Sequence, residues 1–534
     1  MAALACAIGL TVKYGSTYRP VVEPVREIEE IWALEDAREE SKEPLVTRLF
    51  CNGVPMAYDA ENNVFYGSLG LENGTQWPEI KLTASEEAAK GLSLCFADDY
   101  GFDDCDAAIR EGYSYQIFAY TDTAYSYAEV VFTGLPLVNV TADQTIERED
   151  VPAQIEIALA AEGLQTNGRI HKRGGASILN DKVGYKLEFT RTTDGQKKIY
   201  REIPGMGTDS QVILLPMNAL DTTMMRDRLS WALYARLTRR DEPFSARKTQ
   251  YCELFLNGEY RGVYLMLEPF SVRQEVAKAG EERLTTDSVY RTAVISLSHG
   301  RPCMEDPYSA ATGFELYYPM DGEPDFSPLA DYFALLGETD DAAFMRRAAQ
   351  IIDLDSALRY DVVLQLFGLT DNVINNMYTW AQNSRGHTRY RFDFWDLDVS
   401  WGLKRDEIGE MHENWVFFPL VDRLLRADEE GGVRQRYGEI YREVREKAFD
   451  AETVEALVGQ YAHELNDSGA MARNAERWET ENYAADGYEL VAFAAERIAL
   501  LDEPVRAMSA GEKIDLRFLE KTNYDDKGTP LSEE

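Results

Sequence analysis

Residues 364–403 read LQLFGLTDNVINNMYTWAQNSRGHTRYRFDFWDLDVSWGL and place a group of carboxylates and amides between segments that should be buried. The preceding run, 362–369, is apolar and has helical character. Asp371 and Asn376 follow it, five positions apart, and the apolar strand-like run 377–380 begins immediately afterwards. Polar loop residues held by a buried scaffold often carry function, so we interpret this segment as a candidate catalytic centre.

The spacing from Asp371 to Asn376 is that of the catalytic loop in kinases. In such a loop the aspartate accepts the proton of the substrate hydroxyl, and the asparagine five residues later holds a magnesium ion. A second strand-like run, 390–395, ends at Asp396 and Asp398, whose carboxylates can join the same metal. Hard oxygen ligands suit Mg²⁺ or Mn²⁺. The segment therefore predicts a catalytic Asp371 and a metal site at Asn376, Asp396 and Asp398.

A simpler interpretation of the same residues remains open. Aspartate and asparagine commonly end helices and form turns, so the run from Asp371 to Asn376 is also typical of a turn between a helix and a strand. Asp396 and Asp398 can equally be the polar positions of an alternating strand that leaves its sheet at Gly402.

Length and charge limit the classes of function. A chain of 534 residues exceeds what one hydrophobic core normally supports, so we expect roughly two to four domains. With 93 acidic and 55 basic residues, the net charge of -38 argues against a nucleic-acid-binding protein and against docking on anionic lipid. The expected partners are cations, cationic protein segments and ligands held through Mg²⁺.

The cysteines and histidines argue against a zinc site. The six cysteines show no paired metal-ligand spacing, and the five histidines are scattered. Cys95 and Cys105 flank an acidic loop and can form a disulfide if the chain is exported. Two free thiols are the alternative.

The first predicted region, 1–44, combines an apolar start with an acidic linker. Its first ten residues, MAALACAIGL, lack the basic flank of a complete signal peptide and are too few to span a bilayer. They are either the remnant of a signal or anchor, or a short buried strand. The acidic portion at 27–39 has helical character, and no later window predicts a membrane helix.

Two further regions differ in pattern. Residues 45–150 alternate apolar and polar positions between turn signals, which predicts a β-rich, sandwich-like accessory domain. The charged run 147–150 marks its end. Residues 404–510 carry the spacing of amphipathic helices, and the polar tail 511–534 is expected to fray.

A glycine-containing loop opens the part that follows residue 150. Strand-like runs at 155–159 and 169–191 are organised around the loop 173–177, RGGAS. Glycines let backbone amides approach an anion closely, and Lys182 or Lys186 on the following strand can reach phosphate oxygens. A simple hairpin turn is the commoner meaning of Gly-Gly.

The order of the remaining elements adds to this pattern. Asp221 marks the start of an amphipathic helix with Arg226 in its first turns. Asn257-Gly258 is a strong hairpin signal between two strands, the second of which ends at Glu268. Strands with a glycine loop, a lysine strand, a helix, a hairpin, an Asp-to-Asn loop and a strand ending in Asp occur in the order of a kinase fold.

Over about residues 150–420 the sequence resembles the spore-coat-protein-H-like (CotH) kinases. Several separate motifs occur in the family's order, and chance seldom produces such a series. The matching residues are Arg173-Gly174 with Ser177, Lys182 and Tyr185; Asp221 with Arg226; Asn257-Gly258, Tyr260 and Gly262-Val263-Tyr264; Glu315 with Pro319; Asp371 with Asn376; and Trp395-Asp396 with Asp398.

The resemblance implies an α+β, protein-kinase-like domain of two lobes at 151–510. The N-lobe would span about 151–270 and the C-lobe about 271–510, with ATP and Mg²⁺ or Mn²⁺ bound between them and phosphate passed to protein Ser or Thr. Asp371 matches the family's catalytic aspartate. Asn376 and Asp396 match its metal ligands, and Asp398 does so less directly. The nucleotide-binding positions implied are Arg173, Gly174, Ser177, Lys182 or the alternative Lys186, Arg226 and Glu268. The loop reads Gly-Gly-Ala-Ser where the family commonly has Gly-Asn-Ser-Ser, so the resemblance does not define which atoms of the loop contact the phosphates.

Two classes of function remain after the sequence analysis. The first is an active Ser/Thr kinase, expected as a monomer that is extracellular or attached to the cell envelope, with spore coat or cytoplasm as alternatives. Its acceptor is expected to be a segment rich in Lys or Arg, drawn by the negative charge. The alternative is that the charge only keeps the protein soluble and that the groove that binds the acceptor is neutral. The second is a surface binding protein in which a kinase-like domain serves as a scaffold without catalysis.

Overall fold

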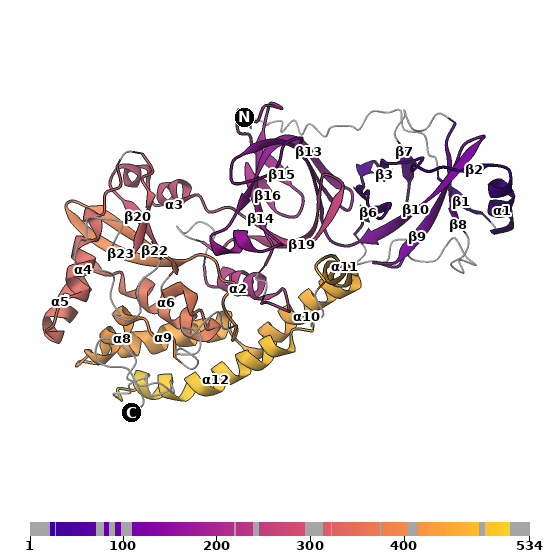
Figure 1. Ribbon diagram of the computed structural model, residues 1–534. Coiled ribbons are helices and arrows are strands. Elements are labelled where there is room, and N and C mark those ends of the chain that lie inside the picture. The colour runs from indigo at the N-terminus through magenta and orange to yellow at the C-terminus, as the bar shows by residue number, and fades with distance from the viewer. Residues whose placement is uncertain are drawn as a thin grey trace, which may run out of the picture. The chain divides into compact units, whose positions relative to one another are not determined.

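The computed structural model describes residues 22–26, 28–70, 80–84, 91–97, 109–217, 220–238, 245–293, 313–321, 323–373, 375–403, 415–479 and 486–512 (Figure 1). The chain divides into two compact units. The first comprises Met1–Pro216, Gln250–Glu268 and His463–Tyr483; the second comprises Met217–Thr249, Pro269–Ala462 and Ala484–Glu534. The expectations for residues 1–10, for Cys105 and for 513–534 lie outside the described residues.

The amino-terminal part of the first unit contains two sheets. The larger is ordered β1 (Val22–Arg26), β8 (Ser93–Ala97), β9 (Ser114–Tyr120), β10 (Ala124–Thr133), β6 (Val64–Ser68) and β5 (Ala57–Asp59), and β2 (Glu39–Glu40) pairs with β10. The smaller is ordered β4 (Val54–Pro55), β3 (Leu49–Cys51) and β7 (Leu82–Ala84). Leu49 and Leu82 of the smaller sheet share an apolar core with Ile117 and Val130 of the larger one, consistent with the predicted sandwich. The acidic helix α1 (Ile28–Asp36) forms where the sequence predicted it.

A closed barrel follows in the same unit. Its order is β11 (Leu137–Thr141), β12 (Val151–Leu159), β13 (Glu162–Arg173), β14 (Gly184–Thr190), β17 (Gln211–Leu215), β19 (Glu259–Leu267) and β18 (Thr249–Leu256). Strands alternate inward and outward residues, and β14 shows this clearly: Tyr185, Leu187 and Phe189 enter the barrel core, whereas Lys186 and Glu188 do not. The small hairpin β15 (Arg201–Ile203) and β16 (Gly207–Asp209) is separate.

Two sequence predictions about the barrel are confirmed. The strands β13 and β14 flank the glycine loop, which contains the short 3₁₀ turn η3 (Ala176–Leu179). The strands β18 and β19 are joined by Asn257 and Gly258, both with positive φ (54° and 78°), as a two-residue hairpin turn requires. The closure of the strands into a barrel was not predicted.

The second unit is built on a sheet ordered β21 (Phe314–Tyr318), β20 (Ser288–Ala293), β22 (Asn375–Ser384) and β23 (His387–Phe394). Its helices are α2 (Arg226–Ala235), α3 (Val272–Lys278), α4 (Ala330–Leu336), α5 (Asp341–Ile351), α6 (Leu354–Phe367), α8 (Pro419–Arg426), α9 (Gly432–Lys447), α12 (Tyr488–Ser509) and most of α10 (Ala451–Asp467). Helix α11 (Ala470–Arg477) belongs to the first unit. Short 3₁₀ turns occur at η4 (Glu281–Thr285), η7 (Ser327–Leu329) and η8 (Asp371–Val373).

Helix α6 lies between the β22–β23 hairpin and the helices α8, α9 and α12 (Figure 1). Its residues are buried almost all round, which explains why its sequence is apolar without a clear stripe. The amphipathic pattern predicted in the carboxyl-terminal part is confirmed as α9, α10 and α12. Helix α9 ends at Lys447 and α10 begins at Ala451, so the two are separate helices.

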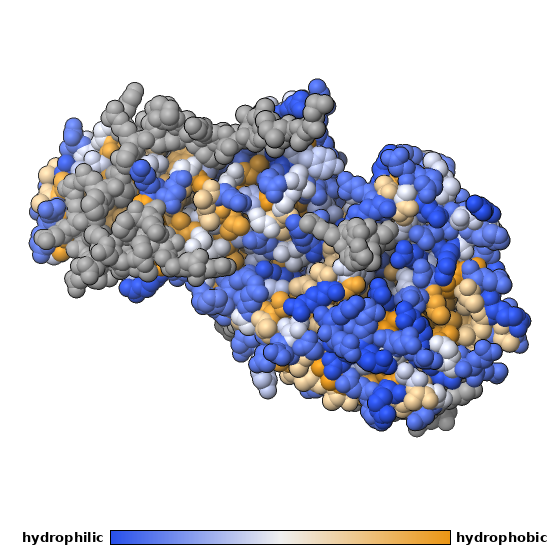
Figure 2. All heavy atoms as spheres, turned by 180° about the vertical axis from the view of Figure 1, so that it is seen from behind, coloured by the Kyte–Doolittle hydropathy of each residue, from blue (hydrophilic) through white to orange (hydrophobic). Residues whose placement is uncertain are grey.

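The chain is therefore a mixed α+β protein. On the face drawn in Figure 2, hydrophilic residues predominate and hydrophobic residues occur in scattered groups, as is normal for an exposed protein surface. Among the described helices, none is long and apolar enough to cross a membrane. The domain limits drawn from the sequence stay predictions.

Candidate active site

The loop that carries Asp371 begins where α6 ends. Gly368 adopts a left-handed conformation (φ 66°) at the end of this helix, and the Leu369 amide bonds to the Leu364 carbonyl. A glycine in this conformation is a common way to end a helix. The chain then turns through η8 (Asp371–Val373) and enters β22 at Asn375. The apolar helix and the Gly-Leu-Thr that follows it therefore place Asp371 at the start of the loop.

The Asp371 carboxylate is oriented by two amide side chains. Asn375 donates from Nδ2 to Asp371 Oδ1 over 3.1 Å, and Asn376 donates from Nδ2 to Asp371 Oδ2 over 2.8 Å. The residue is largely buried, with 7% of its surface exposed. Asp371 and Asn376, paired in the sequence prediction, therefore do meet, and Asn375 joins them.

A third asparagine ties this loop to the strand end that carries Asp396. Asn372 is fully buried, and its Nδ2 donates to the Trp395 carbonyl oxygen over 2.8 Å. The Tyr360 hydroxyl in turn donates to the Asn372 carbonyl oxygen over 2.7 Å. Asn372 could not be singled out from the sequence, because a polar residue in a turn gives no sign of its partner.

The proposed metal ligands lie at the end of the β22–β23 hairpin. The Trp395 amide donates to the Asn376 carbonyl over 3.0 Å, so Asn376 and Asp396 occupy neighbouring strand ends. Both have left-handed backbones, with φ of 59° and 58°. Such conformations are uncommon in residues other than glycine, although asparagine and aspartate adopt them more readily than most. Asp398 is half-buried two residues further on.

This donor set fits the chemistry of a magnesium ion. Magnesium is usually held by one or two carboxylates together with substrate phosphates, and not by a cage made only of protein. In the parts of the chain that the structure describes, no group of three or more His, Cys, Asp or Glu residues forms a metal cage. Two carboxylates, an amide oxygen and incoming phosphates meet the requirement without such a cage.

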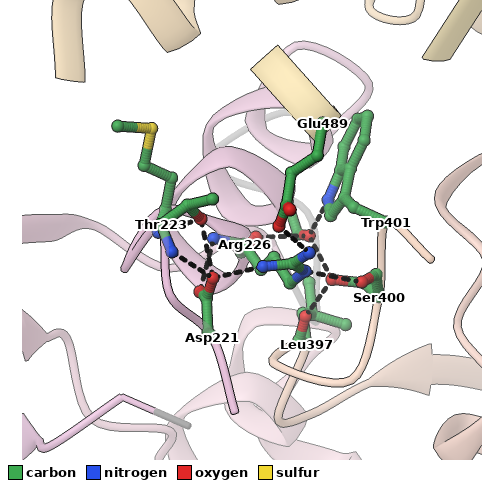
Figure 3. Close-up of polar contacts among 9 residues, drawn as sticks. Asp221, Thr223, Arg226, Leu397, Ser400, Trp401 and Glu489 are labelled. Carbon is green, nitrogen blue, oxygen red and sulfur yellow. Dashed lines mark hydrogen bonds and ion pairs between the residues drawn. The ribbon is translucent and has the colours of Figure 1, made fainter. Parts of the chain in front are cut away.

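Arg226 lies in the same unit, at the start of α2, and its side chain is 5% exposed (Figure 3). Its guanidinium donates to a carboxylate oxygen of Asp221, to Glu489 Oε1 over 2.5 Å and, from Nε, to the Ser400 carbonyl oxygen over 3.1 Å. The predicted nucleotide contact of Arg226 stays a prediction; the structure gives each of its side-chain nitrogens a protein partner. Glu489 was missed because it lies 263 positions from Arg226 in the sequence.

The glycine loop belongs to the first unit. Gly174 has a φ of 129°, and a Cβ there would lie 2.4 Å from Ser177 Oγ. Only glycine therefore allows the Ser177 hydroxyl to pack against the loop backbone. Arg173 is the last residue of β13 and is half-buried. Arg173, Gly174 and Ser177 are thus together at one end of the β13–β14 connection.

The two candidate lysines have different surroundings. Lys182 donates from Nζ to the Val263 carbonyl oxygen and, over 2.9 Å, to Asn474 Oδ1, and its amine lies 4.9 Å from the centre of the Tyr264 ring. Burial lowers the pKa of Lys182 to about 7. Lys186 is on the outward face of β14, and burial followed by the nearby Lys198 lowers its pKa. The choice between them stays open.

Glu268 directly follows β19 in the first unit and is half-buried. Asn474, on helix α11, is a partner of Lys182 that the sequence analysis missed. Its Oδ1 also accepts the Val263 amide over 3.0 Å. An asparagine in an amphipathic helix far along the chain gives no local signal of this contact.

A family model described as CotH kinase protein matches residues 170–501 of the chain. The match includes every residue that the sequence analysis placed in the site, from Arg173 to Asp398. A comparison with curated proteins finds no match.

Proposed function

The chain belongs to the CotH kinase family, and from this premise we propose that it transfers the γ-phosphate of ATP to Ser and Thr hydroxyls of a protein substrate. The observation that carries the proposal is the Asp371 carboxylate, held through both oxygens by Asn375 and Asn376 beside the strand end of Asp396. A fixed carboxylate is the group that phosphoryl transfer to a hydroxyl needs.

In the proposed reaction, Asp371 orients the acceptor hydroxyl and takes its proton. The hydroxyl oxygen forms a bond to the γ-phosphorus while the bond from that phosphorus to the ADP oxygen breaks. Asn376, Asp396 and Asp398 would hold magnesium, which when bound neutralises charge on the phosphates. The amides of the loop around Gly174, with Lys182 or Lys186 and Glu268, are proposed to bind the nucleotide.

Calorimetry on paired variants tests the division of roles. Asp396→Asn should remove the Mg²⁺-dependent part of ATP binding, because it removes a charged metal ligand. Asp371→Asn should keep ATP binding and lose turnover, because its role begins when the hydroxyl reacts. If both variants bind Mg²⁺-ATP and turn it over as the wild type does, the site is wrongly assigned. Absence of both ATP binding and turnover in the wild type would favour the non-catalytic scaffold.

We propose that the acceptor is a basic Ser- or Thr-containing segment, on the strength of the net charge of -38. Salt should weaken this preference, since exposed charges are screened over about 8 Å at physiological ionic strength. A peptide array scored for phosphate at two salt concentrations tests it. Equal labelling of basic and acidic peptides at both concentrations would leave the charge with a role in solubility only.

We also propose that the protein is exported or attached to the cell envelope, based on its apolar first ten residues and the β-rich region that precedes the kinase-family part. Fractionation of cells that produce the native gene product tests this. A signal only in the cytosol would defeat the proposal.

A further inference from the structure

Arg226 connects three segments that lie far apart in the sequence of the second unit. Besides its bond to the Ser400 carbonyl oxygen, its guanidinium meets Asp221, which precedes α2, and Glu489, in the first turn of α12 (Figure 3). Asp221 is itself fixed, because it accepts hydrogen bonds from the backbone amides of Thr223 over 3.1 Å and of Arg226 over 3.2 Å. Because Asp221 is fixed in this way, it also fixes the guanidinium of Arg226 that donates to Ser400.

Ser400 connects Arg226 to the segment that carries the proposed metal ligands. Its hydroxyl donates to the Leu397 carbonyl oxygen over 2.7 Å, and Leu397 is the residue between Asp396 and Asp398. The Ser400 carbonyl oxygen accepts a hydrogen bond from Arg226 Nε and a second one from the Leu403 amide over 3.0 Å. The turn that carries both carboxylates is thus tied by two successive hydrogen bonds to the Arg226 guanidinium.

Only arginine can make this connection. Its planar fork carries donors on three nitrogens, whereas lysine offers a single ammonium that cannot reach three oxygens in different directions. The two carboxylates that pair with Arg226 differ in exposure. The Glu489 side chain is 51% exposed, whereas the Asp221 side chain is 3% exposed. Replacing Glu489 therefore leaves the buried Asp221–Arg226 pair intact and changes only the outer contact.

We propose that Arg226, braced by Asp221 and Glu489, is a positioning residue that sets the metal-binding carboxylates Asp396 and Asp398 through Ser400, and does not itself contact the nucleotide. The inference rests on the proposed function for the role of those carboxylates. It makes the first turn of α12, near the carboxyl-terminal end of the family match, part of the site's support. Outer groups of this kind typically change metal affinity about 10–100-fold when they are replaced.

The first experiment needs no metal or nucleotide. Hydrogen exchange, followed by mass spectrometry, is measured on the peptide covering 395–403 in the wild type, Arg226→Lys, Glu489→Gln and the control Glu496→Gln. Glu496 is exposed, two turns further along α12, and its change removes the same charge. We expect this peptide to exchange faster than in the wild type in Arg226→Lys and in Glu489→Gln. In the control it should exchange at the wild-type rate. Unchanged exchange in Glu489→Gln would overturn the inference, even if Arg226→Lys failed to fold.

The second experiment measures Mn²⁺ binding by electron paramagnetic resonance with a non-hydrolysable ATP analogue. Arg226→Lys should lose about 10–100-fold in Mn²⁺ affinity and Glu489→Gln about tenfold, whereas nucleotide binding in EDTA should stay at the wild-type level. A loss of binding in EDTA for Arg226→Lys would overturn the inference in favour of a direct contact. Wild-type protein that binds no Mn²⁺ would refute the proposed function, while altered exchange at 395–403 would still support the constraint on the turn.

Discussion

The side-chain amide of Asn372 donates a 2.8 Å hydrogen bond to the backbone carbonyl of Trp395, and Asn372 has no exposed surface. Asn372 directly follows Asp371, and Trp395 directly precedes Asp396. One buried bond therefore joins the loop of the proposed catalytic aspartate to the strand end of the proposed metal ligand. Together with the hydrogen bond from the Trp395 amide to the Asn376 carbonyl, it sets their relative placement.

We expect Asn372→Ala to lower both stability and phosphate transfer. The substitution leaves the Trp395 carbonyl without its buried donor, which costs about 1–3 kcal/mol of unfolding free energy. Urea unfolding and a transfer assay at saturating ATP measure the two effects. Asn383→Ala is the matched control, since Asn383 is on β22 and exposed. Equal behaviour of the two variants would mean that the bond contributes nothing.

Local features of a site are easier to read from a sequence than distant contacts. Asp371 and Asn376 are five residues apart on one loop, and the structure joins their side chains by a hydrogen bond, whereas their catalytic and metal-binding roles stay predictions. Glu489 and Asn474 reach their partners across more than two hundred residues, and no periodicity marks them. Barrel closure also depends on a distant pairing, because β11 pairs in parallel with β18, more than one hundred residues later.

Asp393 should make stability depend on pH. Burial raises the pKa of Asp393 to about 7, and the hydroxyl of Tyr234 and the amide of Phe394 both donate to its Oδ1. Between about pH 4 and 7 the folded state keeps a proton that the unfolded state has lost, so stability falls as pH rises through this window. Above about pH 7 the penalty is complete, because both states are ionised.

Asp393→Asn should remove this penalty, since an amide in place of Oδ2 keeps both hydrogen bonds. Its unfolding free energy should exceed that of the wild type by an amount that grows from pH 4.5 to 7 and then stays constant. Urea unfolding at pH 4.5, 6, 7 and 8 measures it. Asp502→Asn is a control of opposite sign: partial burial acts to raise the pKa of Asp502, but hydrogen bonds from Arg445 and Tyr441 outweigh it and lower the pKa below its ordinary value of 3.8. This substitution should therefore lower the unfolding free energy by an amount that stays constant from pH 4.5 to 8. Parallel curves for wild type and Asp393→Asn would refute the prediction.

Gly262→Ala should loosen helix α11 from strand β19. A Cβ at Gly262 would lie 2.4 Å from Asn474 Oδ1 and 2.9 Å from Trp478 Nε1, and its φ is 88°. Gly258→Ala shares the positive φ (78°), but its nearest neighbour would be Ala60 Cβ at 3.6 Å. The backbone strain of roughly 1 kcal/mol is common to both. Limited proteolysis at 463–479 should therefore be faster only for Gly262→Ala, and equal rates would contradict the steric argument.

Arg473→Ala should destabilise the first unit by about 3–5 kcal/mol, because it leaves the fully buried Glu253 carboxylate without its cation. Arg477→Ala removes a more exposed pair with Glu259 and should cost about 0–1 kcal/mol. Thermal unfolding of the two variants measures the difference. A similar, small effect of both would show that Glu253 is stabilised without Arg473.

The most direct test of the account is transfer of labelled γ-phosphate from ATP to a Ser-containing basic protein in the presence of Mg²⁺, with wild type and Asp371→Asn compared at equal ATP occupancy. We predict labelled serine with the wild type and a rate lower by about 10²–10⁴-fold with Asp371→Asn, because the variant cannot accept the hydroxyl proton. Labelling at the same rate by both proteins, or by neither while ATP is bound, would contradict the assignment of Asp371 as the base of a protein kinase.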